Sequence, residues 1–156
     1  MSTCKYNGLR VLFNTLLLFF IASNFAYAQE PSNLILGKWI SLQGNVIIQV
    51  YKDSYAFKGK VIWFRDTDDK SRPMTIRTDM HNPDINLQSR KILGLEVLDG
   101  LTYNARSNCW ENGRIYDVKT GRVWSSTIWM ESEDLLKVRG FWHFEFIGRT
   151  MTFKRL

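Results

Sequence analysis

Apolar and polar residues alternate in short segments along most of this chain. Between positions 55 and 64, aromatic, glycine or β-branched residues occupy the odd positions, and Lys58 and Lys60 lie between them. A repeat of two residues places successive side chains on opposite faces of a strand, and turn residues such as Gly44-Asn45 separate the segments. The pattern predicts strands over 38–42, 46–52, 55–64, 113–117, 122–131, 135–147 and 149–156.

The segment 135–147 shows how such a strand divides its side chains. One face carries Leu136, Val138, Gly140 and Trp142, and the other face begins with Lys137 and continues with alternate residues. A glycine on the apolar face leaves space that a large side chain from elsewhere in a small barrel often fills. Closely spaced strands with short turns, and no clear amphipathic helix, predict an all-β fold: one antiparallel meander of about eight strands that closes into a β-barrel.

One long polar segment, 65–90, interrupts the series of strands. It is too long for a hairpin loop, and long loops often carry function. Within it, Asn82 can cap a helix, Pro83 fits the first helical position, and Asp84 complements the helix dipole. The segment therefore predicts one short helix over about 83–89.

The first 28 residues have the pattern of an export signal. Lys5 and Arg10 precede an apolar stretch over 11–22, and Ala26-Tyr27-Ala28 places small residues where a signal peptidase cleaves. We expect cleavage after Ala28 and a mature single domain over 29–156, located in the periplasm or outside the cell. The apolar stretch is too short for a comfortable membrane span, so any membrane association would be peripheral.

Charge and cysteine content exclude some classes of protein. The net charge is +6 for 156 residues, and the mature 128 residues would keep 19 basic and 15 acidic residues, a net charge of +4. The basic residues are dispersed, which argues against a nucleic-acid partner. Cys109 would be the lone cysteine after cleavage, so it cannot form an internal disulfide; a bridge to another molecule or a buried thiol remain alternatives.

The polar residues do not form a recognisable catalytic or metal-binding motif. The loop residues Asp79, His81, Asn82 and Asp84 could offer ligands to calcium, but their spacing differs from an EF-hand, and Asn82 and Asp84 already suit a helix cap. The two histidines, His81 and His143, are too few for a zinc site, and no glycine-rich phosphate loop is present. We therefore predict neither a metal nor a cofactor, and we expect no enzyme: an acid or base role for Asp79, Asp84 or Asp117 has no supporting constellation.

Two sets of residues could contribute to a binding site. The first is polar: Arg90, Arg114, Tyr116, Asp117 and Arg139 could clamp an anion, or Asp117 could pair with an arginine and hold a turn, which is the interpretation we favour. The second consists of six tryptophans, which could line a cavity, fill the barrel, or form outer patches. These tryptophans are Trp39, Trp63, Trp110, Trp124, Trp129 and Trp142.

Together these residues resemble a bacterial family known as domain of unknown function 2147. The matching motifs are Gly37-Lys38-Trp39, the segment 59–63, Asp79 with Asn82-Pro83-Asp84, Arg90 before 92–95, the segment 110–117, Gly121, the segment 138–140 and the final 153–155. Val118 and Lys91 stand where this family often has proline. The resemblance implies an exported single-domain barrel similar to the lipocalins, and it implies no accepted activity.

The first and last strands suggest how such a barrel is closed. The Gly-x-Trp motif at Gly37 and Trp39, with Arg155 on the last strand, looks like the closed end of lipocalin-type barrels. The Trp39 indole would plug that end, and the Arg155 guanidinium would stack on it and reach backbone carbonyls.

Two functional hypotheses follow from this fold. The first is non-catalytic binding of a small, partly apolar ligand at the open end, with Trp63, Trp124, Trp142, Arg114 and Arg139 as the ligand-binding residues. The alternative is an envelope interaction or structural module with a filled barrel and an exposed aromatic surface. A hollow interior would favour the first hypothesis, and a packed interior the second.

Overall fold

A computed structural model describes residues 30–142 and 148–156 of the chain, and residues 31–156 form one compact unit. The predicted export signal over 1–28 lies outside the described residues. So does part of the predicted strand 135–147, including His143.

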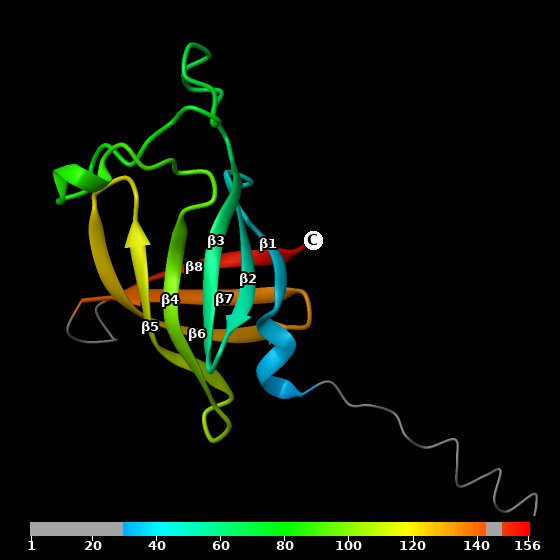
Figure 1. Cartoon of the computed structure of the whole chain (residues 1–156). Helices are drawn as coiled ribbons and strands as arrows, with labels where there is room; N and C mark the ends of the chain where they lie inside the picture. Colours follow the sequence, from blue (N-terminus) through cyan, green and yellow to red (C-terminus); the bar gives the residue numbers. More distant parts are fainter. Residues whose placement is uncertain (1–29, 143–147) are drawn as a thin grey trace, which may run out of the picture. The chain divides into compact units, whose positions relative to one another are not determined.

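The described residues form a closed antiparallel β-barrel in which each strand pairs with the next and the last pairs with the first (Figure 1). This confirms the predicted all-β meander. The strands are β1 (Gly37–Ser41), β2 (Val46–Asp53), β3 (Ala56–Phe64), β4 (Glu96–Asn104), β5 (Cys109–Asp117), β6 (Arg122–Ser132), β7 (Leu135–Phe141) and β8 (Gly148–Arg155).

Two strands differ from the sequence prediction because bulges break their alternation. The predicted strands did not include β4, in which Leu98 and Leu101 are both buried although they are three residues apart. The pairing of β4 with β3 shifts register between these two leucines. β5 begins at Cys109 instead of 113, and its register shifts between Trp110 and Gly113. Each bulge inserts an extra residue, so the two-residue period disappears.

The helix predicted over 83–89 is much shorter in the structure. Only η3 (Ile85–Leu87) forms, a single 3₁₀ turn whose N-cap is Asp84 and not Asn82. The Asn82 side chain instead accepts a hydrogen bond from the backbone N–H of Asp84, at 2.9 Å. Asparagine and aspartate side chains that bond to the backbone two residues ahead favour turns over continued helix. The chain then returns to pair Lys91 with Thr78.

One end of the barrel is closed by η2 (Pro31–Ile35) and two tryptophans. The buried Trp39 indole donates a hydrogen bond to the carbonyl of Ile35, at 2.8 Å, and Trp110 donates to the carbonyl of Ser32, at 2.9 Å. Buried indole N–H groups thus have partners. The core at this end consists of Ile35, Trp39, Val50, Phe57, Leu98, Leu101, Trp110, Ile128, Leu136, Val138 and Phe153.

Arg155 lies over this closed end. Its guanidinium carbon is 4.2 Å from the centre of the Trp39 ring, and its two terminal nitrogens donate to the carbonyls of Leu36, at 3.0 Å, and Leu34, at 2.6 Å. A side chain at Gly37 would come within 3.3 Å of the same guanidinium. The arginine therefore joins η2 to both the first and the last strand.

Candidate functional site

The opposite end of the barrel carries the longer loops, and there the interior face of the strands is partly open to solvent. On β8, Phe153 is buried opposite Leu136, but Met151, two residues away on the same face and opposite Val138, is 46% exposed. Trp142, which follows β7, is 55% exposed. Apolar side chains that face the interior and still reach water line an opening instead of completing a core.

Small residues lie on the interior face just below this opening. Ser126 of β6 is paired with Gly113 of β5 on one side and with Gly140 of β7 on the other. The space beside Gly113 is filled, because a side-chain carbon there would collide with Leu101 and with the Ser126 hydroxyl. At Gly140 the nearest atoms to such a carbon are Trp124 Cβ at 3.7 Å and Ile115 Cδ1 at 4.0 Å, an ordinary contact distance. The interior over Gly140 therefore has room for an added group.

We call this region the mouth and define it by six residues: Ile115, Trp124, Ser126, Gly140, Trp142 and Met151. The rings of Trp124 and Trp142 meet edge to face with their centres 5.8 Å apart (interplanar angle 77°). Ser126 is only 1% exposed, and its hydroxyl has no hydrogen-bond partner among the described residues. This hydroxyl lies on the Gly113 side, 2.6 Å from where a side-chain carbon of Gly113 would be, and a buried hydroxyl without a partner is costly.

The structure brings together two of the five predicted ligand-binding residues, Trp124 and Trp142. The other three lie on the outer face. A bulge in the β2–β3 pairing places Trp63 opposite Ile47, whose side chain faces away from the interior occupied by Trp39 and Ile48. The two-residue period had placed Trp63 on the interior face, and one inserted residue reverses that assignment.

The two predicted arginines also point outward. Arg114 of β5 donates to Asp99 of β4, at 2.8 Å. Arg139 of β7 lies opposite Thr150 and close to Gly148, on the face opposite to the buried Val138. The sequence analysis missed Ser126 and Arg149, which share the interior face with Gly140. The alternation of Arg149, Met151 and Phe153 was the available signal for Arg149.

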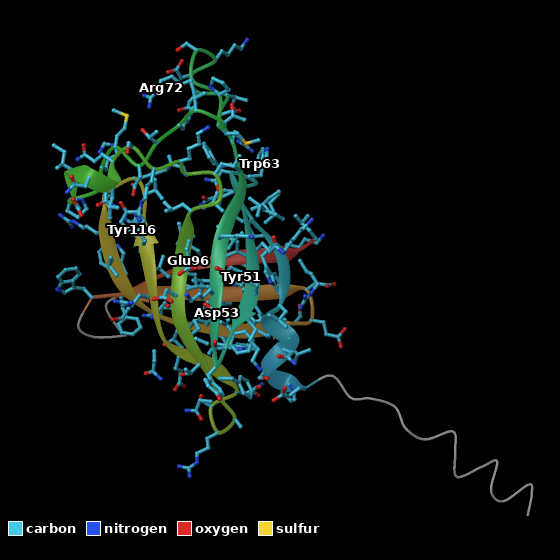
Figure 2. All side chains as sticks on the ribbon, viewed as in Figure 1. Tyr51, Asp53, Trp63, Arg72, Glu96 and Tyr116 are labelled. Carbon is cyan, nitrogen blue, oxygen red and sulfur yellow. The ribbon has the colours of Figure 1, made fainter. Side chains whose placement is uncertain are left out.

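A second polar cluster holds the long connection between β3 and β4 against β5. Asp79 is 0% exposed, and its carboxylate accepts hydrogen bonds from Arg90 Nε at 2.9 Å, Tyr116 Oη at 2.7 Å and Asn82 Nδ2 at 2.9 Å. We call Asp79, Asn82, Arg90 and Tyr116 the loop clamp; Figure 2 labels Tyr116 near the loop end of β5. These hydrogen bonds tie the connection to β5 through one buried carboxylate, so the clamp is a structural anchor.

The turn between β5 and β6 contacts the same connection. Gly121 has a φ of 69°, and a side-chain carbon there would collide with the backbone carbonyl oxygen of His81. Asp117 was predicted to pair with an arginine, but it holds this turn instead, by accepting from the Lys119 N–H at 3.0 Å and from Thr120 Oγ1 at 2.8 Å. The buried aspartate–arginine pair is Asp79 with Arg90.

The loop clamp should make the free energy of unfolding decrease at alkaline pH, because the Tyr116 hydroxyl then ionises. Burial, followed by the hydrogen bond to Asp79, raises the pKa of Tyr116 above its usual value. A pKa raised by folding means that the stabilisation is complete below the unfolded pKa, about 10, and is lost as the pH rises through the folded pKa. We therefore expect Tyr116→Phe to lose less stability than the wild type as the pH is raised above about 9.

Urea unfolding across this pH range checks the prediction. The matched control is Tyr55→Phe, since Tyr55 lies in a turn and is almost fully exposed. The control should follow the wild-type curve. Parallel curves for Tyr116→Phe and the wild type would contradict the assigned pKa shift.

Two further features concern metal ligands and helix length. Across residues 30–142 and 148–156, no three His, Cys, Asp or Glu side chains are grouped so that they could hold a metal ion. Within the same part of the chain, no helix is both long enough and apolar enough to cross a membrane.

Comparison with known proteins places the chain in a family. No curated protein matches it. The solved structure of protein HP1028 from Helicobacter pylori, described as belonging to the lipocalin family, is similar at 19% sequence identity with a TM-score of 0.64, covering 83% of this chain and 84% of that one. This similarity shows a lipocalin-like fold. A family model described as an uncharacterized protein conserved in bacteria matches residues 37–155, and the chain therefore belongs to that family, DUF2147.

Proposed function

We propose that this protein is exported and that its mature barrel binds a small, partly apolar molecule in the mouth, without catalysing a reaction. Export is supported by the signal-like pattern over residues 1–28. Binding is supported above all by one observation: the mouth exposes interior-facing apolar side chains, Met151 and Trp142, beside Gly140, where an added side-chain carbon would meet its neighbours only at ordinary contact distance. The lipocalin-like fold is compatible with such a site.

The two ends of the barrel differ in a way that favours a ligand over a fully packed interior. At the closed end, Trp39, Trp110 and Phe57 are buried and fill the interior. At the mouth, three successive interior positions on neighbouring strands carry two glycines and a serine, and Leu101 fills the space at only one of the glycines, Gly113. An apolar ligand over Gly140 would cover exposed Trp and Met surface and gain roughly 25 cal/mol per Å² of apolar area removed from water.

Filling the space at Gly140 should weaken binding of a ligand in the mouth. We expect Gly140→Leu to weaken binding of the neutral apolar dye N-phenyl-naphthylamine by at least about tenfold, because the leucine would occupy the volume between Trp124 and Ile115. Binding is measured by dye fluorescence and by quenching of the tryptophans.

The matched control is Ser125→Leu, which adds the same side chain on the exposed outer face of β6. The control variant should bind the dye as the wild type does. Equal binding by Gly140→Leu and the wild type would place the dye elsewhere, and no binding of this dye or of other small apolar molecules by the wild type would refute the proposal.

A second candidate, an envelope interaction module, is favoured by the exposed apolar side chains around the loop end. Ile76, Met80, Ile85 and Leu87 on the β3–β4 connection and Val123 at the start of β6 are all at least 40% exposed. Exposed apolar patches commonly contact partners. This candidate would be supported if charged substitutions at Ile85 and Leu87 released a specific envelope protein while Gly140→Leu did not.

A further inference from the structure

A row of outward-facing residues crosses four neighbouring strands of the barrel. On β1 the buried Trp39 faces the interior, so Ile40 faces outward, and the residues paired with Ile40 share its face. The bulge between β2 and β3 brings Trp63 onto the same face, and Figure 2 labels Trp63 near the loop end of β3. From β8 to β3, the row consists of Lys154, Ile40, Ile47 and Trp63.

A second outward row lies beside the first. It consists of Lys38 of β1, Gln49 of β2 and Lys60 of β3. The apolar residues of the first row are half-buried, so part of each side chain reaches water. Leu42, the next alternate position after Ile40, is 64% exposed. The result is an apolar strip bordered by lysines, which we call the basic-apolar face and define by Lys38, Ile40, Ile47, Lys60, Trp63 and Lys154.

Charge divides the strands of the barrel into two groups. The consecutive strands β8, β1, β2 and β3 contain seven basic residues and one acidic residue, Asp53. The next three strands, β4 to β6, contain two basic and five acidic residues. The basic-apolar face therefore lies on the strands that carry a net positive charge.

The lysines of this face are not neutralised by the chain itself. Asp53 is bound to Lys58 at 3.0 Å, away from the strip. Lys38, Lys60 and Lys154 form no ion pair with residues 30–142 or 148–156, and Lys60 instead lies 5.5 Å from the centre of the Tyr51 ring. Their charge is therefore available to an anionic surface outside the chain.

We propose that the basic-apolar face docks on the surface of a lipid bilayer that contains anionic lipids. Apolar side chains that enter the boundary between head groups and acyl chains leave water, and flanking lysines attract the anionic head groups. Indole rings are favoured at that boundary because they combine an apolar body with a polar N–H. A fluid bilayer can also adapt to the convex outside of a barrel. This inference is independent of ligand binding in the mouth.

Sedimentation with lipid vesicles tests the proposal. Residues 29–156 are used, because the apolar stretch 11–22 would bind lipid by itself and residues 31–156 form one compact unit. The vesicles consist of phosphatidylcholine alone or of phosphatidylcholine with added phosphatidylglycerol, which is anionic. We expect binding to the anionic vesicles to be at least about tenfold tighter, and this preference should shrink as salt is added.

Charge substitutions locate the contact. Lys38→Gln combined with Lys60→Gln should remove most of the preference for anionic vesicles. The matched control combines Arg106→Gln with Arg122→Gln, which removes the same charge from exposed positions outside β8, β1, β2 and β3. The control should keep most of the preference, because its arginines lie outside the proposed contact.

Quenching by lipids with brominated acyl chains locates the inserted indole. These lipids quench tryptophans that enter the bilayer, so the wild-type emission should fall on binding, and most of this fall should be absent in Trp63→Phe. The matched control is Trp129→Phe, since Trp129 follows the buried Ile128 and faces outward from β6. Quenching should persist in that control. Urea unfolding checks that each variant is folded.

Several results would overturn this inference. They are equal binding to the two kinds of vesicle, no binding to either, a loss of preference in the arginine control equal to that in the lysine variant, and unchanged quenching in Trp63→Phe. Capture of an envelope protein that Trp63→Glu releases, without vesicle binding, would assign the face to a protein contact instead. Dye binding in the mouth, measured without vesicles, should be unchanged in all these variants, and its absence from the wild type would refute the proposed function alone.

Discussion

Replacing Trp39 with alanine is expected to lower the free energy of unfolding by about 3–5 kcal/mol, the range for large aromatic side chains deleted from a core. Trp39 is 1% exposed, and its neighbours are η2, the first and last strands and Arg155. The variant would leave a cavity at the closed end, remove the hydrogen bond to the Ile35 carbonyl and leave the Arg155 guanidinium without the ring beneath it.

Urea or thermal unfolding of purified Trp39→Ala measures this loss. Trp39→Phe keeps most of the packing and removes the indole N–H, so we expect a smaller loss, about 1–2 kcal/mol. Trp142→Ala deletes an indole of the same size that is largely exposed, and its effect should stay near or below about 1 kcal/mol. Equal losses in Trp39→Ala and Trp142→Ala would contradict the assignment of Trp39 as the plug of the closed end.

Asp79→Ala should destabilise the protein by about 2–4 kcal/mol, because the buried carboxylate is the shared acceptor of the loop clamp. Without it, the Tyr116 hydroxyl and the Asn82 amide lose a common acceptor, and Arg90 loses its ion pair at 2.8 Å. The Arg90 side chain is 35% exposed and can turn toward water, which keeps the expected loss below that of a fully buried charge.

The loss is measured by urea unfolding, and hydrogen exchange locates it. We expect faster exchange for the Asp79 and Ile92 amides, which bond to Arg90 and Arg77 across the connection, and little change in β1 or β8. Asp84→Ala removes an exposed N-cap in the same connection and serves as the control, with an expected loss of about 1 kcal/mol or less. An Asp79→Ala variant as stable as Asp84→Ala would show that the clamp does not hold this connection.

The closed end and the loop clamp stabilise the fold, whereas the mouth is the proposed binding site. The closed end is packed around Trp39 and Trp110, and the clamp anchors the long connection, so these stabilising contacts are made by side chains that are not part of the mouth. Substitution of Gly140, where an added side-chain carbon meets its neighbours only at ordinary contact distance, should therefore alter binding with little effect on stability. This separation allows binding and folding to be measured independently in the same set of variants.

The pattern along the chain by itself determined the fold class and much of the closed end. Alternation of apolar and polar residues identified most of the strands, since burial of one face imposes a two-residue period. The Gly-x-Trp motif and the terminal arginine indicated a contact that the structure shows between Trp39 and Arg155. The strands are readable because they depend on local periodicity, and the contact at the closed end was expected because the motif resembles that of lipocalin-type barrels.

Only the tertiary structure decided which side chains face the mouth. The alternation defines two faces of a strand, but one inserted residue exchanges them, and such bulges moved Trp63 to the outside and obscured β4 and the start of β5. Ser126 and Arg149 each pair with Gly140 from a different neighbouring strand, and the Asp79 carboxylate accepts a hydrogen bond from Tyr116, which lies 37 residues later in the chain. Register and long-range contacts are properties of the closed barrel, because they arise when its strands pair and not within any one segment.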